Sequence, residues 1–207
     1  MNIRDIMSLA PVIPVITIEK LSDALPLAEA LLEGGLPVLE VTLRTAVALE
    51  AIAAIRSRFP EAVVGAGTVI NQRNFEQAAN SGAQFIVSPG CTEALLQIAK
   101  QFQLPLLPGV STASEVMVLL EQQILAMKFF PAEAAGGIPM LKSLAGPLSQ
   151  AMFCPTGGIT YELAAQYLAL PNVACVGGSW MVSKELINNG RWQDIKTAAQ
   201  KAAALAS

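Results

Sequence analysis

Histidine is absent from this chain of 207 residues, so any active site has to work without an imidazole group. A serine or cysteine nucleophile that depends on a histidine base is therefore excluded. Acid–base chemistry would have to use carboxylates, lysine, tyrosine or water.

Charged residues are also scarce, at 14% of the chain with a net charge of -3. No basic surface is available to neutralise the phosphates of nucleic acid or anionic lipid, so we expect neither as a partner. The apolar stretch 9–18 is too short to cross a bilayer, contains Pro11 and Pro14, and has no basic, cleavable signal around it. The sequence predicts a cytoplasmic protein.

Cysteine is rare too, with Cys91, Cys154 and Cys175 widely spaced along the chain. An odd number at such spacing argues against a disulfide framework and matches no zinc pattern. We expect each cysteine to be a small residue of the core.

Hydrophobic residues are abundant, at 53%, and the length fits a single domain spanning residues 1–207. Short runs rich in Val, Ile and Leu alternate with longer stretches of helical periodicity, as in repeated βα units around a parallel sheet. Ser22 is a candidate N-cap for the first long helix, and Gly34 and Gly35 are its stop signal. The eight predicted strands are 12–18, 37–43, 62–68, 84–89, 105–110, 125–130, 151–157 and 172–178.

Eight strands and eight helices in about 200 residues predict an α/β fold of the (β/α)8 TIM barrel type. Residues 1–10 are expected to form a short lead-in helix that covers the bottom of the barrel. An open doubly wound sheet is the alternative, but no G-x-G-x-x-G follows the first strand to support it.

Lys128 stands in the middle of a predicted buried strand, between Met127 and Phe129 and close to Phe130. Lysine is rarely buried without a reason. It either extends its ammonium to the surface or pairs with a carboxylate, or it is a desolvated amine available for covalent chemistry.

The second strand carries a further set of polar residues in the segment LEVTLR. Two-residue alternation places Glu40, Thr42 and Arg44 on one face. An internal salt bridge between Glu40 and Arg44 is the purely structural interpretation, because buried charges are normally paired.

Other strand ends carry glycine and hydroxyl groups, where a barrel of this type places its chemistry. Thr68 ends GAGT, and Pro89 lies in the turn SPG, which need be no more than a turn. The last two strands end in PTGG and GGS, with Thr156 and Ser179 beside paired glycines. Exposed backbone N–H groups at such turns predict an anion site, for a phosphate or a second carboxylate.

The segments LEVTLRT, VGAGTV, SPG, KFFPAE, FCPTGGI and GGSW occur in this order along the chain. Together they resemble the 2-keto-3-deoxy-6-phosphogluconate (KDPG) aldolase and 4-hydroxy-2-oxoglutarate (KHG) aldolase family, from about Pro11 to Trp180. The resemblance implies a class I aldolase and lyase on a (β/α)8 barrel, usually a homotrimer, with no metal or organic cofactor.

The resemblance also implies roles for individual residues. Lys128 is expected to form the Schiff base and Glu40 to carry protons. Thr156 is expected to influence the stereochemistry at the aldehyde end. The remaining substrate-binding residues divide between the carboxylate of pyruvate (Arg44, Thr68), the phosphate (Gly157, Gly158, Ser179) and the walls of the site (Pro89, Phe130).

Two other functions share part of this pattern. A phosphate-binding decarboxylase or epimerase would use the glycine turns without needing Lys128 in an apolar wall. A non-catalytic binding barrel would keep the anion site and tolerate the loss of Glu40.

Overall fold

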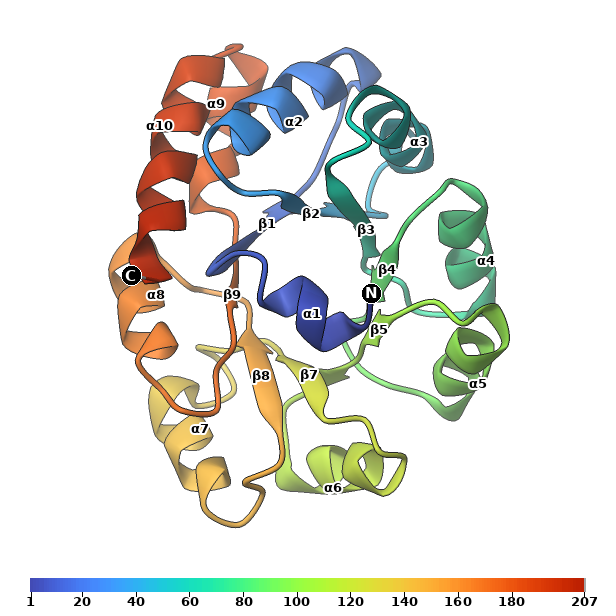
Figure 1. Cartoon of the computed structure of the whole chain (residues 1–207), viewed down its shortest axis with the longest axis vertical. Helices are drawn as coiled ribbons and strands as arrows, with labels where there is room; N and C mark the ends of the chain where they lie inside the picture. The colour runs from blue at the N-terminus through green and yellow to red at the C-terminus, as the bar shows by residue number, and fades with distance from the viewer. Residues whose placement is uncertain (207) are drawn as a thin grey trace.

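Parallel strands surround the centre of the molecule and helices cover them on the outside, in the computed structural model of residues 1–206 (Figure 1). The α-helices are α1 (Ile3–Met7), α2 (Ala24–Glu33), α3 (Ala48–Arg58), α4 (Gln72–Asn80), α5 (Glu93–Phe102), α6 (Ala113–Glu121), α7 (Gly137–Ala145), α8 (Tyr161–Leu168), α9 (Lys184–Asn188) and α10 (Trp192–Ala203). The strands are β1 (Val12–Ile16), β2 (Val38–Thr42), β3 (Val63–Gly67), β4 (Phe85–Val87), β5 (Leu106–Leu107), β6 (Gly109–Val110), β7 (Ala126–Phe129), β8 (Met152–Pro155) and β9 (Val176–Gly178). Short 3-10 turns occur at Leu21–Asp23, Trp180–Val182 and Ala204–Ala206.

The strands form two parallel sheets. One has the order β5-β4-β3-β2-β1-β9 and the other the order β6-β7-β8. Isolated parallel bridges link Phe153 with Val173 and Thr156 with Gly177. The predicted α/β class with parallel strands and alternating helices is therefore confirmed.

The fifth and eighth predicted strands differ in extent from the structure. The segment 105–110 divides into β5 and β6 at Pro108, because proline has no N–H group to donate to a ladder. The carbonyl of Pro108 still accepts a hydrogen bond of 2.8 Å from the Lys128 amide. The predicted strand 172–178 is regular only from Val176 onward.

The predicted cap of α2 was wrong. The helix begins at Ala24 after a 3-10 turn, and Asp23 occupies the N-cap position without a side-chain cap. The Ser22 hydroxyl donates to Asp23 Oδ1 at 3.3 Å instead. The predicted stop is confirmed, since Gly34 is the C-cap and Gly35 takes a positive φ of 86°.

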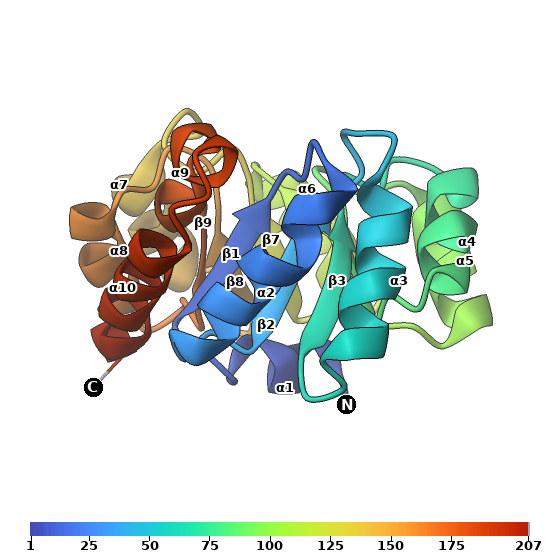
Figure 2. The same ribbon diagram turned by 90° about the horizontal axis from the view of Figure 1, so that it is seen from above.

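Apolar side chains form two layers. One fills the space between strands and helices, and includes Leu39 and Val41 of β2. The other lies inside the ring of strands, where Val38 and Cys154 pack against Met7 of α1. Helix α1 lies across the end at which the strands begin, so the opposite end is left for polar groups (Figure 2). Within residues 1–206, no helix is long and apolar enough to span a membrane.

Candidate active site

Lys128 is a buried residue of β7, and its partners in the two adjacent strands are small. Its backbone pairs with Gly109 of β6 and Cys154 of β8. The residue is 6% exposed, and Nζ lies 3.2 Å from Oε1 of Glu40. The side chain therefore does not extend to the surface; it is paired with a carboxylate, and its burial also leaves the amine desolvated.

Glu40 reaches Lys128 from β2, on the same face of the strand as Thr42. It is 3% exposed. Thr42 has a structural role, because its hydroxyl donates to the carbonyl of Ile16 at 2.9 Å and lies 3.0 Å from that of Thr17. The expected salt bridge between Glu40 and Arg44 is wrong, since Glu40 pairs with Lys128.

Arg44 is an exposed residue beyond the end of β2, and it faces the loop after β3. Its Nε donates to the Thr68 hydroxyl at 3.1 Å. Thr68 holds a positive φ of 60°, a conformation unusual for a threonine. Both Nη groups of Arg44 are without a partner among residues 1–206. They could take a planar carboxylate from two directions.

The turn after β8 has its amide groups fixed by the segment that follows Lys128. The Ala132 amide donates to the Thr156 carbonyl at 2.8 Å, and the Glu133 amide to the Gly157 carbonyl at 3.2 Å. Since C=O and N–H point in opposite directions in a trans peptide, the N–H groups of Gly157 and Gly158 face away from this segment. The Gly158 N–H has no hydrogen-bond partner in residues 1–206 and is free to bind an anion, whereas the Gly157 N–H faces β9, where Thr156 forms its bridge with Gly177.

Tyr167 holds this segment from outside. Its hydroxyl donates to Oε1 of Glu133, and the Glu133 side chain lies against Gly158. Burial and the neighbouring Glu133 carboxylate raise the pKa of Tyr167 well above its usual range, so it remains a donor. The positive φ angles of Gly157 and Gly158, 104° and 77°, explain why glycine occupies both positions.

A cavity of about 210 Å³ brings most of the predicted residues together. The expected residues Arg44, Lys128, Phe130, Thr156, Gly157, Gly158 and Ser179 line it, together with Val15, Ile159, Gly177 and Gly178. Lys128 Nζ lies 5.3 Å from the centre of the Phe130 ring. The lining thus combines one amine, one guanidinium, hydroxyls and glycine amides around an apolar wall, which suits an anionic substrate with a reactive carbonyl.

Three predicted residues lie behind this lining. Glu40 contacts the lining residue Lys128 through their ion pair, and Thr68 accepts a hydrogen bond from the lining residue Arg44. Pro89 packs over Gly109, where an added β-carbon would come within 2.3 Å of the Pro89 carbonyl group. Pro89 therefore borders the strand beside Lys128, and its contact with substrate stays a prediction.

Sequence reasoning missed Val15 and Gly177 as lining residues. Val15 lies opposite Glu40 in the β1–β2 ladder, and strand alternation alone could have placed it on the inner face. Gly177 leaves room for Thr156, because a β-carbon there would lie 2.2 Å from the Thr156 Oγ1 atom. That packing depends on two strands meeting in space and has no signal in the sequence.

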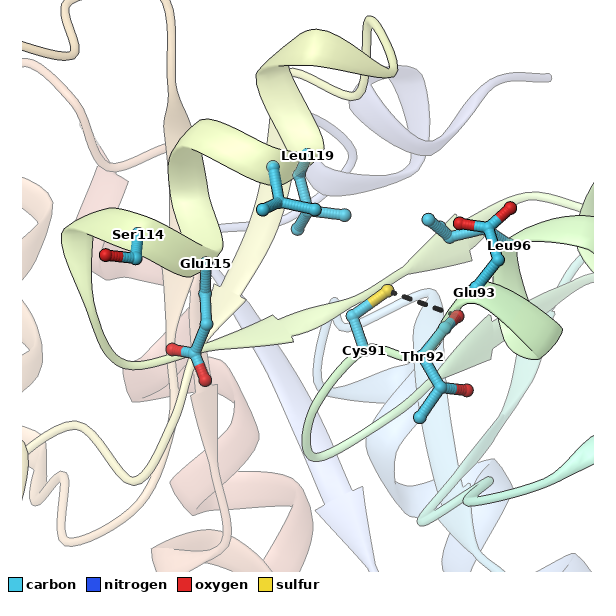
Figure 3. Close-up of a pocket in the computed structure, with 8 residues that line it drawn as sticks. Cys91, Thr92, Glu93, Leu96, Ser114, Glu115 and Leu119 are labelled. Carbon is cyan, nitrogen blue, oxygen red and sulfur yellow. Dashed lines mark hydrogen bonds between the residues drawn. The ribbon is translucent and has the colours of Figure 1, made fainter.

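A larger cavity of about 350 Å³ lies between the first turns of α5 and α6 (Figure 3). It is lined by Cys91, Leu96, Glu115 and Leu119 among others, and shares no lining residue with the Lys128 cavity. Burial, and then the nearby Glu93 carboxylate, raise the pKa of the Cys91 thiol to about 11, so this thiol is a poor nucleophile.

The other two cysteines are buried residues of the interior, as predicted. A hydrogen bond with Cys154 and complete burial raise the pKa of Cys175 well above its usual range. Within the described chain, 1–206, no three side chains of His, Cys, Asp or Glu gather closely enough to hold a metal ion.

Comparison with protein families places residues 3–198 on the model described as "KDPG and KHG aldolase". The chain is 49% identical over 199 residues to the KHG/KDPG aldolase of Escherichia coli strain K12, covering 96% of this chain and 93% of that protein. It is 54% identical over 181 residues to the 2-dehydro-3-deoxy-phosphogluconate aldolase of Zymomonas mobilis, covering 87% of this chain and 86% of that one.

Among solved structures, the chain is similar to KDPG aldolase from Legionella pneumophila with a TM-score of 0.97 and 48% identity. The alignment covers 99% of both chains. In that structure pyruvate was captured at low pH as a covalent carbinolamine intermediate.

Proposed function

The chain belongs to the KDPG and KHG aldolase family, and we propose that it is a class I aldolase acting on 2-keto acids. It cleaves KDPG to pyruvate and D-glyceraldehyde 3-phosphate, 4-hydroxy-2-oxoglutarate to pyruvate and glyoxylate, or both. The observation that carries this proposal is the buried Lys128 amine in the cavity, 3.2 Å from the Glu40 carboxylate.

Lys128 is the proposed nucleophile. Transfer of one proton from its ammonium group to Glu40 leaves a neutral amine beside a carboxylic acid. The amine attacks C2 of the keto acid, and the proton on its nitrogen passes to the ketone oxygen to give a carbinolamine. Glu40 then protonates the hydroxyl group, which leaves as water, and an iminium cation remains next to the Glu40 carboxylate.

Glu40 is the proposed acid and base of the carbon–carbon cleavage. Its carboxylate takes the proton of the C4 hydroxyl, the C3–C4 bond breaks, and the electron pair moves to the iminium nitrogen as an enamine. The aldehyde leaves. Glu40 returns the proton to C3, and hydrolysis of the new iminium releases pyruvate and restores Lys128. One carboxylate placed 3.2 Å from Nζ is within reach of each transfer.

Binding of the two ends of the substrate is assigned to opposite sides of the cavity. Arg44, held by Thr68, takes the carboxylate next to the ketone. The turn of Gly157 and Gly158, through the free Gly158 amide, and the Ser179 hydroxyl take the phosphate or the distal carboxylate. Thr156, between Lys128 and the glycine turn, faces the carbon that becomes the aldehyde.

We further propose that β5 and β6 act as one strand and that the two sheets close into a single (β/α)8 barrel in one domain. The bridge from Thr156 to Gly177 and the single residue Pro108 between β5 and β6 support closure. We also propose that the protein is a homotrimer in the cytoplasm and uses no metal or organic cofactor. This part of the proposal rests on the family resemblance and on the charge composition.

The test combines a pyruvate-release assay with borohydride reduction in the presence of pyruvate. We expect pyruvate from at least one of the two substrates, inactivation by borohydride, and a reduced pyruvyl adduct on the peptide containing Lys128. Lys142, an exposed lysine on α7, is the matched control and should carry none. A decarboxylase or epimerase would act on its own substrate without forming an adduct, and a binding barrel would show neither turnover nor an adduct. An adduct at Lys142 or Lys184 in place of Lys128 would overturn the mechanism.

A further inference from the structure

We propose that Gly67 is a positioning residue for Glu40, an inference that rests on the proposed function of that carboxylate. Gly67 is the last residue of β3 and pairs with Thr42 of β2, two residues beyond Glu40. A β-carbon at Gly67 would lie 2.2 Å from Oε1 of Glu40 and 2.8 Å from its Cγ and Cδ. Oε1 is also the oxygen that accepts the hydrogen bond from Lys128.

The backbone at Gly67 does not itself require glycine. Its φ lies outside the left-handed region that the positive-φ residues of this chain occupy. Alanine could adopt the same strand conformation, and would restrict the unfolded chain more than glycine does. The reason for glycine at this position is therefore the space that the Glu40 side chain fills.

Glu40 is also the group that would give way. The three atoms nearest to the added β-carbon all belong to its flexible side chain, and none belongs to the backbone. A Gly67→Ala substitution should consequently leave the fold in place and rotate the carboxylate away from Nζ of Lys128. The amine would still be able to attack a ketone, while the proton transfers that depend on Glu40 would slow.

Gly65 provides a contrast on the same face of the same strand. A β-carbon there would meet the Phe85 ring at 2.4 Å, in the apolar interior below the site. Gly65 is the register partner of Glu40, but the three atoms nearest to its added β-carbon all belong to the Phe85 ring, so Gly65→Ala disturbs apolar packing first. Gly146, which has no atom within 4 Å of an added β-carbon, is the neutral control.

The experiment is a double-mutant cycle of Gly67→Ala with Glu40→Ala, read by kcat, KM, borohydride trapping of pyruvate and Tm. Gly67→Ala should lower kcat by about 100-fold or more, the usual size of general acid–base catalysis, with a much smaller change in KM and with the adduct on Lys128 retained. In the Glu40→Ala background it should lower kcat no further. Gly146→Ala should match the wild type in all four measurements.

The Tm arm of the cycle does not depend on aldolase activity, so it tests this inference even if the proposed function fails. Gly67→Ala should lower the Tm of the wild type but not that of Glu40→Ala. If Gly67→Ala does not fold, recovery of folding in the double variant supports the proposal and failure of both variants overturns it. A wild-type kcat for Gly67→Ala, or an equal loss of Tm in both backgrounds, would also overturn it.

Discussion

Lys128 and Glu40 form an ion pair across the interior, with 3.2 Å between Nζ and Oε1 and only 7% and 4% of the two side chains exposed. They come from β7 and β2, which belong to different sheets. A buried pair of this kind is costly to desolvate. Removal of either partner therefore lowers the stability of the protein, because the other charge is left buried without a counter-charge.

Replacement of Lys128 by methionine removes the proposed nucleophile and leaves the Glu40 carboxylate buried without its partner. We expect no detectable aldolase activity or borohydride trapping, and a loss of about 3–5 kcal/mol in the free energy of unfolding. Lys128→Met combined with Glu40→Gln should recover much of that stability and none of the activity. Urea unfolding at pH 7 measures the stability of both variants, and the pyruvate-release assay measures their activity. Retention of activity in the folded single variant would exclude Lys128 as the nucleophile.

Replacement of Glu40 by glutamine keeps the shape of the side chain and removes its ability to take a proton. Turnover should fall by about 100-fold or more, while pyruvate is still trapped on Lys128, but more slowly because Glu40 also assists formation of the iminium. Glu50→Gln on the exposed face of α3 is the matched control and should leave kcat unchanged. Unchanged turnover in Glu40→Gln would remove this carboxylate from the mechanism.

Replacement of Ser179 by aspartate places a negative charge beside the glycine turns that border the cavity. We expect kcat/KM to fall more for KDPG than for 4-hydroxy-2-oxoglutarate, because the phosphate carries the larger negative charge. Ser114→Asp, at the first turn of α6, adds the same charge outside this cavity. Equal losses on both substrates would mean that Ser179 does not meet the phosphate.

The Cys91 thiol should react slowly with iodoacetamide in spite of its partial exposure. Its pKa is raised to about 11, mainly by burial, so only a small fraction is thiolate near neutrality. The rate of labelling should keep rising by about tenfold per pH unit between pH 7 and 9.5. Peptide mapping by mass spectrometry follows Cys91, with buried Cys154 and Cys175 as internal controls, and a plateau by pH 8 would contradict the prediction.

Much of the candidate site could be predicted from the sequence because polar residues inside apolar strands are conspicuous. Lys128 stood out among Met127, Phe129 and Phe130, and the paired glycines pointed to a turn with free amides. The partner of Glu40 could not be predicted in the same way. Two-residue alternation offered Arg44 because it is close in the chain, whereas the partner in the structure comes from a strand 88 residues away.

The alternation of strands and helices could be predicted from the sequence, because the period of apolar residues is a local property of the chain. The sequence also determined which residue types were available for chemistry, since a chain without histidine must use lysine and carboxylates. Both conclusions follow from neighbours along the chain and need no knowledge of how distant strands meet.

Which of these residues share one cavity, and what each of them touches, depends on how the chain folds in three dimensions. The register of β2 against β3 brings Gly67 beside Glu40, and the ring of strands brings Glu40 to Lys128. Such contacts are set by the packing of whole strands, in which one side chain occupies the space that another leaves open.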